Sequence, residues 1–101
     1  MNDLVPSEFF LSQNYPNPFN EKTIIKFCVA YKTKVKLEVF NSEGERIKVL
    51  VNEEKEAGTY EVEFSALGGQ APSIKHPESE IYFYRLEAGN YKSEKKMILS
   101  K

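Results

Sequence analysis

Asn14-Tyr15-Pro16-Asn17-Pro18-Phe19-Asn20 is the stretch that decides how the rest of the chain is arranged. It holds two prolines, three asparagines and two aromatic residues in seven positions. Each proline fixes its own φ and keeps the residue before it out of the helical region. Asparagine side chains bond to nearby backbone, and the rings of Tyr15 and Phe19 are suited to anchoring a loop in a core. The stretch therefore predicts a stiff, self-bonded corner between two strands.

On both sides of this corner the chain alternates apolar and polar residues in short runs, which is the period of a β-strand. The expected strands are a short one that begins near Leu4 and ends at Leu11, then Thr23–Ala30, Val35–Phe40, Ile47–Val51, Tyr60–Phe64, Ile81–Leu86 and Tyr91–Leu99. Turn signals separate them at intervals of about 8–12 residues. The pattern predicts an all-β fold, an antiparallel β-sandwich of about seven strands and of the immunoglobulin or fibronectin type III kind.

Three details follow from the alternation. In the strand Val35–Phe40, Lys36 and Glu38 are expected to face water while the residues between them point inward. The charged segment Asn52–Gly58 is expected to be a loop between strands. Ile81–Leu86 is apolar on both faces at its start, so it is expected to be a central strand covered on both sides. Tight turns are expected at 41–44 and 88–90, each of which contains a glycine.

Composition narrows the class of protein. The chain has 101 residues, 41% of them hydrophobic, which suits one domain with a modest core. Its 14 basic and 15 acidic residues are mixed along the sequence, so no basic face for nucleic acid is indicated. No apolar run reaches the roughly 20 residues of a membrane helix. Asp3, Pro6 and Glu8 interrupt any signal-peptide core, so a signal would lie upstream if the domain was cut from a longer chain.

No group of residues points to catalysis, to a cofactor or to a metal. Cys28 and His76 are each the only residue of their kind, and nothing in the sequence places them together. Glu53, Glu54 and Glu56 are interpreted as a solvated segment. Calcium loops draw on several aspartate and asparagine ligands, whereas this chain has a single aspartate. The expectation is a protein that is not an enzyme and holds no cofactor or metal.

The aromatic residues near the end of the chain allow two interpretations. They are Tyr82, Phe83, Tyr84 and Tyr91. Exposed, they would form a platform for a sugar or for single-stranded nucleic acid. The favoured interpretation is a sandwich core with a tyrosine corner, because the chain has no tryptophan to serve a carbohydrate site.

Residues 9–101 resemble the type A C-terminal sorting domain of the type IX, or Por, secretion system, and also the related immunoglobulin-like domain of flagellar hook-capping proteins. The resemblance is carried by the opening signature Phe9–Asn20, the hairpin Val35–Asn41 with Gly44, the turn Ala57–Tyr60, and the closing segments Ile81–Leu86 and Lys95–Lys101. Glu21 stands where that family usually has a third proline, and Ser79-Glu80 where it usually has Ser-Gly.

The resemblance implies a non-catalytic C-terminal sorting signal that directs an exported cargo protein through the type IX outer-membrane translocon. Residues 1–101 would be one sorting domain, with residues 1–8 a remnant of the linker from the cargo. In many members a sortase removes the domain and joins the cargo to surface lipopolysaccharide. The implied partners are the translocon, the sortase and the upstream cargo domain of the same chain, with no nucleic acid and no membrane span. The implied location is secreted or at the cell surface of a Gram-negative bacterium, reached through the periplasm and outer membrane.

The residues expected to be recognised come from the corner and from the last strand. They are Asn14, Tyr15, Pro16, Asn17, Pro18, Phe19 and Asn20, together with Lys95, Lys96, Met97, Leu99 and Lys101. Recognition by strand addition or docking at the edge of the last strand is the expected mode. Two alternatives stay open at this point. One is a structural or assembly module, hook-capping-like or a spacer beside an upstream enzyme, and the other is a carbohydrate-binding module.

Overall fold

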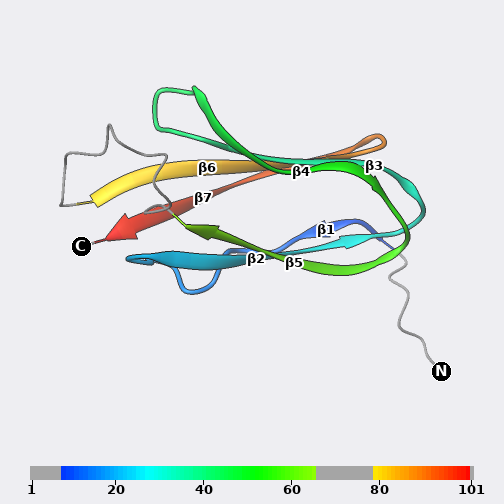
Figure 1. Ribbon diagram of the computed structural model, residues 1–101, viewed down its shortest axis with the longest axis horizontal. Coiled ribbons are helices and arrows are strands. Elements are labelled where there is room, and N and C mark those ends of the chain that lie inside the picture. The colour runs from blue at the N-terminus through cyan, green and yellow to red at the C-terminus, as the bar shows by residue number, and fades with distance from the viewer. Residues whose placement is uncertain (1–7, 66–78, 101) are drawn as a thin grey trace.

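Two antiparallel sheets packed face to face make up the protein (Figure 1). The computed structural model describes residues 8–65 and 79–100. The strands are β1 (Phe10–Leu11), β2 (Lys22–Val29), β3 (Thr33–Phe40), β4 (Arg46–Lys55), β5 (Gly58–Ser65), β6 (Ser79–Ala88) and β7 (Tyr91–Ser100). One sheet has the order β1-β2-β5 and the other β4-β3-β6-β7. This arrangement confirms the predicted all-β sandwich. The described residues contain no helix long and apolar enough to span a membrane.

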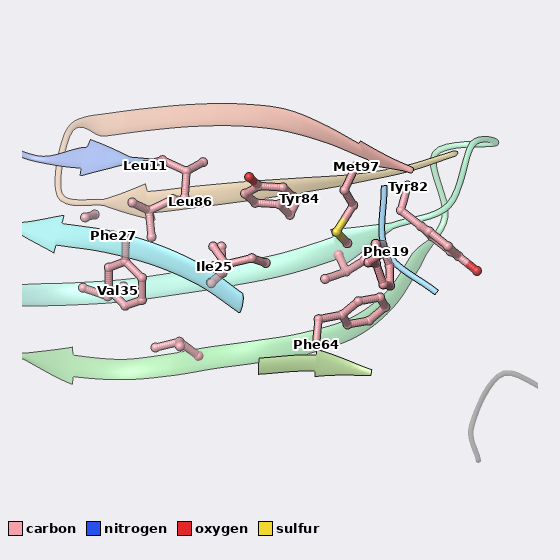
Figure 2. Close-up of a cluster of buried hydrophobic side chains, with 14 of the residues drawn as sticks. Leu11, Phe19, Ile25, Phe27, Val35, Phe64, Tyr82, Tyr84, Leu86 and Met97 are labelled. Atoms are coloured by element: carbon pink, nitrogen blue, oxygen red, sulfur yellow. The ribbon is translucent and has the colours of Figure 1, made fainter. Parts of the chain in front are cut away.

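The core lies between the sheets because most strands turn apolar residues inward, whereas the edge strand β4 buries only Val51 (Figure 2). In β2 the inward residues are the alternating set predicted from the sequence, Thr23, Ile25, Phe27 and Val29. The facing sheet contributes Val35, Leu37, Val39, Val51, Tyr82, Tyr84, Leu86, Ala88, Met97 and Leu99. Such burial of alternate residues is what holds the two layers together, since removing apolar surface from water is the main favourable contribution to folding.

The two predicted tight turns are present, and both use a glycine with positive φ. Gly44 has a φ of 87° and Gly89 a φ of 60°. At the first turn the side-chain Oδ1 of Asn41 accepts the backbone N–H groups of Glu43 and Glu45, both at 2.9 Å. The asparagine therefore closes the β3–β4 hairpin from within, as short polar side chains commonly do in turns.

The segment predicted to be the loop Asn52–Gly58 is mostly strand, so that prediction is wrong. β4 continues to Lys55, with Glu53 and Glu54 paired opposite Val35 and Lys34 of β3. Charged residues are compatible with this position because β4 is an edge strand with solvent on its open side. The strand also carries irregularities of register where it faces Leu37–Phe40, and these locally bend an edge away from regular pairing.

Two further predictions about the four-stranded sheet need correction. Glu38 was expected to face water, yet its exposed fraction is only 5%. It lies on the outer face between Val49 of β4 and Arg85 of β6, and its carboxylate pairs with Arg46 at 2.9 Å. β6 is central in its sheet, as predicted, but Ile81 on its outer face is 40% exposed. A two-layer sandwich has no third layer to cover that face.

Several predicted features lie outside the described residues. They are the first seven residues, Lys101, and residues 66–78, which include His76 and most of the irregular stretch that the sequence indicates between the expected strands Tyr60–Phe64 and Ile81–Leu86.

Candidate functional site: the corner and the last strand

The corner at Asn14–Asn20 is closed by its own side chains, as the sequence predicts. The side chain of Asn14 is buried, and its Nδ2 donates to the carbonyl oxygen of Pro16 at 3.1 Å and to Oγ1 of Thr23 at 2.9 Å. The Thr23 hydroxyl in turn donates to the same Pro16 carbonyl at 2.9 Å. The peptide bonds before Pro16 and Pro18 are both cis. One buried amide therefore joins the start of the corner to the beginning of β2, the strand that follows it.

The corner is also bonded to the far end of the chain. The N–H of Ile98 donates to Oδ1 of Asn17, and the N–H of Phe19 donates to the carbonyl of Ile98, both at 2.9 Å. Nε2 of Gln13 donates to the carbonyl of Lys96 at 2.7 Å. These contacts bring together the two groups of residues that the sequence analysis singled out. We call the surface formed by residues 13–20 and 95–99 the corner–β7 junction.

The junction closes part of the sheet edge that β7 would otherwise expose. In an antiparallel ladder the backbone groups of alternate residues point away from the neighbouring strand. On β7 those outward groups belong to Lys96 and Ile98, which the corner occupies. The same alternation makes Lys92 and Glu94 the outward residues of the remaining edge. Only the first half of the β7 edge is therefore left open for the strand addition expected from the sequence.

The members of the junction divide into buried and exposed residues. Asn14, Phe19, Met97 and Leu99 are buried, whereas Tyr15, Pro16, Asn17, Pro18, Asn20 and Lys96 are exposed and Lys95 is half-buried. Phe19 is 2% exposed and packs edge-to-face on Phe64, with ring centroids 6.1 Å apart. The prediction that Phe19 anchors the corner in the core is confirmed, and Figure 2 shows its ring beside Phe64 and Met97.

Tyr15 was predicted to anchor the corner as well, and this prediction is wrong, because its side chain is 80% exposed. Its backbone is fixed by two hydrogen bonds with Ile24, each 3.0 Å long. Residues paired across an antiparallel bridge place their side chains on the same face of the sheet. Ile24 belongs to the outer face of β2, so Tyr15 is held on that outer face too.

A shallow hollow lies beside Tyr15 on the outer face of the three-stranded sheet. Its volume is about 370 Å³, and it is lined by Ser12, Gln13, Tyr15, Ile24, Lys26 and Glu61. Its lining includes the apolar side chain of Ile24 and the ion pair of Lys26 with Glu61, whose Nζ and Oε2 atoms lie 3.6 Å apart. The hollow thus brings together an exposed aromatic ring, an apolar side chain and two oppositely charged side chains.

Tyr84 fixes the segment that leads into the corner. It is fully buried, and its hydroxyl donates to the carbonyl of Ser12 at 2.7 Å. Burial raises the pKa of Tyr84 to about 12, and the backbone N–H of Asn14 lowers it in part. The bond crosses from one sheet to the other, whereas a tyrosine corner bonds to backbone only a few residues upstream. Tyr84 and the equally buried Tyr82 therefore belong to the core and not to an exposed aromatic platform.

The fold and the junction together define a small β-sandwich module in which an early corner is bonded to the last strand. A family model described as a secretion system C-terminal sorting domain matches residues 13–100. The chain belongs to this family and is a C-terminal sorting signal for type IX secretion. The matched span includes both halves of the junction. No curated protein and no solved structure matches the chain.

Membership of this family carries some consequences of its own. Sorting domains of this kind are in general non-catalytic. They interact with the type IX secretion machinery, and they imply export to the cell surface or secretion. The relation to hook-capping proteins stays a prediction.

Replacing Asn17 with alanine is expected to lower the free energy of unfolding by about 0.5–1.5 kcal/mol, because the Ile98 N–H loses its acceptor. Urea denaturation measures this loss, and amide exchange of Ile98 is expected to accelerate. Asn20→Ala is the matched control, since the Asn20 side chain is exposed and makes no hydrogen bond with the described residues. Equal losses for both variants would show that the Asn17 bond contributes nothing.

Proposed function

We propose that the type IX machinery recognises the exposed side of the corner–β7 junction. The observation that supports this proposal is the set of hydrogen bonds that joins Asn17 and Phe19 to Ile98. Through them, two segments at opposite ends of the sequence form a single surface. The domain would thus be read as a folded shape, to which the corner and the last strand both contribute.

The residues of the junction would divide this work by their burial. Asn14, Phe19, Met97 and Leu99 hold the shape from inside, and the exposed residues contact the partner. Tyr15 is the strongest candidate for the main contact, because its backbone is bonded to Ile24 while its ring is exposed. Rigid aromatic side chains are frequent hot spots of protein interfaces, since little entropy is lost when they are covered. Lys96 would add a charged contact beside it.

The proposal extends to partners, route and chemistry. The partners would be the outer-membrane translocon and the sortase, with a cargo domain upstream in the same chain. The cargo would cross the periplasm and outer membrane of a Gram-negative bacterium. Residues 1–101 would form a single sorting domain, with residues 1–8 as the linker from the cargo. The domain itself would not be an enzyme, and any cleavage and surface attachment would be the work of the sortase.

A secretion assay tests this proposal. Residues 1–101 are fused behind a signal peptide and a fluorescent passenger and are expressed in a host with a working type IX system. Tyr15→Ala and Lys96→Glu are expected to lower surface or medium fluorescence by about tenfold, the size expected for loss of one hot-spot contact. The variants are expected to keep the fold, since both side chains are exposed and the Lys96 contact to Gln13 uses only its backbone.

Two controls make the assay decisive. Tyr31→Ala removes another exposed tyrosine, one that lies away from the junction in the β2–β3 connection, and it is expected to leave export unchanged. A host without the translocon reports the background. Wild-type export of the Tyr15 and Lys96 variants would place recognition elsewhere on the domain. Equal surface or medium fluorescence of the unmodified fusion in both hosts would show that the domain does not act as a type IX sorting signal.

A further inference from the structure

The edge of β5 is a second place at which this protein presents unpaired backbone. β5 is an end strand of its sheet, and it pairs with β2 in an unbroken register from Gly58 to Ser65. The edges of the other sheet are less regular, since β4 has shifts of register and the corner occupies the second half of β7. Long, regular and open edges are templates for an added strand. Among the described residues, the β5 edge fits this description best.

The direction in which the backbone groups of β5 point can be derived from the hydrogen bonds that β2 makes on its opposite side, with Ser12 and Tyr15. Ile24 exchanges both of its backbone hydrogen bonds with Tyr15, and the carbonyl of Lys26 accepts the N–H of Ser12. The even-numbered residues of β2 thus turn toward β1 and the corner. Because alternate residues of a strand turn to opposite neighbours, odd-numbered residues such as Ile25 must turn toward β5.

The same alternation assigns the groups on β5 itself. Ile25 is paired with Val62, so the N–H and carbonyl of Val62 are used within the sheet. The residues on either side, Glu61 and Glu63, therefore direct their N–H and carbonyl groups outward to the open edge. Their side chains lie on the outer face of the sheet, and both are exposed.

The side chains along this edge alternate in character. Glu61 and Glu63 face Lys26 and Lys22 of β2 at 3.6 Å and 3.4 Å. These ion pairs are well exposed and contribute little to stability, so the carboxylates are available to a second cation. On the inner face, Tyr60 and Val62 are only half-buried and border the core, and the ammonium group of Lys55 lies 4.9 Å from the centroid of the Tyr60 ring. An incoming strand would thus meet acidic and apolar positions in turn.

We propose that the β5 edge accepts an extended segment of another protein in which basic and apolar residues alternate. The basic side chains would lie opposite Glu61 and Glu63, and the apolar ones would cover Tyr60 and Val62. A second copy of the chain fits poorly, because pairing β5 with β5 would place glutamates beside glutamates. Like charges directly opposite one another destabilise a strand pair. This site lies across β2 from the corner and does not depend on the junction.

Binding of a short peptide that alternates valine and arginine tests the proposal. Titration into the 15N-labelled domain is expected to give saturable shifts centred on β5, with slower amide exchange at Glu61 and Glu63. A peptide that alternates valine and glutamate is the control and is expected to bind at least about tenfold more weakly. Shifts centred on another strand, or equal binding of the two peptides, would overturn the proposal.

Two variants separate the contribution of the backbone hydrogen bonds to peptide binding from the contribution of the carboxylates. Glu61→Pro removes an N–H that β2 does not use, so the sheet is expected to remain intact while peptide binding falls at least about tenfold. Glu61→Ala with Glu63→Ala keeps the N–H groups and is expected to weaken binding of the arginine peptide while removing its salt dependence. The paired alanine variant keeps the test decisive even where the proline disturbs folding. Wild-type affinity in the alanine variant would overturn the proposed charge recognition.

Discussion

Replacing Phe19 with alanine is expected to lower the free energy of unfolding by about 3–5 kcal/mol, the usual cost of removing a buried phenylalanine. The ring is 2% exposed and touches Phe64, so its loss leaves a cavity beneath the corner. A domain of this size has a total stability of only about 5–15 kcal/mol. Chemical denaturation is expected to show a large fall in the midpoint. Export of an attached passenger is expected to fall with it, because the surface loses its internal support.

Tyr15→Ala is the matched control for this prediction, since it removes another aromatic ring from the same corner. The Tyr15 ring is 80% exposed, and substitutions at exposed positions usually change stability by less than about 0.5 kcal/mol. The two variants are therefore expected to separate folding from recognition: Phe19→Ala weakens both, whereas Tyr15→Ala weakens recognition alone. Similar losses of stability in the two variants would contradict the assignment of Phe19 as the anchor.

Raising the pH through the range from 10 to 12 is expected to lower the free energy of unfolding by about 2 kcal/mol through Tyr84 alone. The pKa of Tyr84 is about 12 in the folded protein, against 10.0 for an ordinary tyrosine. Below pH 10 the hydroxyl is protonated in both states, and its full contribution is present. Between the two values only the unfolded chain releases the proton, so unfolding is favoured progressively as the pH rises.

Subtracting the pH dependence of stability of the Tyr84→Phe variant from that of the wild type separates the effect of Tyr84 from that of the other groups that titrate at alkaline pH. The phenylalanine variant is expected to be less stable near neutral pH by about 1 kcal/mol, because the Ser12 carbonyl loses its donor. Its stability is then expected to fall less steeply than that of the wild type between pH 10 and 12. Denaturant titrations at a series of pH values give both curves. Parallel curves would show that Tyr84 is not the group responsible.

The strands themselves were predictable from the sequence because burial on one face forces alternation. Thr23 to Val29 shows this most plainly, since each alternate residue enters the core. The prediction failed where a residue's neighbours, and not its place in the pattern, decide its burial. Glu38 is covered by Arg46 and by the strands on either side, and no alternation rule contains that information. β4 extends beyond its last apolar residue, Val51, to Lys55, because an edge strand tolerates charged side chains.

The candidate site was half predictable, for a related reason. The residue types of the corner indicated bonds within it, and Asn14 makes them. The contact between Asn17 and Ile98 spans 81 positions, and no local pattern indicates which strand the corner would meet. Tyr15 was misplaced because its orientation is set by pairing with Ile24, which depends on the return path of the chain. The closed second half of the β7 edge could not be foreseen either.

The hydrogen bonds between the corner and β7 also have a meaning for synthesis. The ribosome makes a chain from the N-terminus onward, so Gln13 and Asn17 emerge long before Lys96 and Ile98, to which they bond across 83 and 81 positions. A chain that stops after Asn20 but before Lys96 has the corner residues but lacks both of their partners, and it also lacks the buried Met97 and Leu99. Formation of the junction thus requires translation through β7, and a receptor that recognised it, as proposed above, would discriminate against chains truncated before that point.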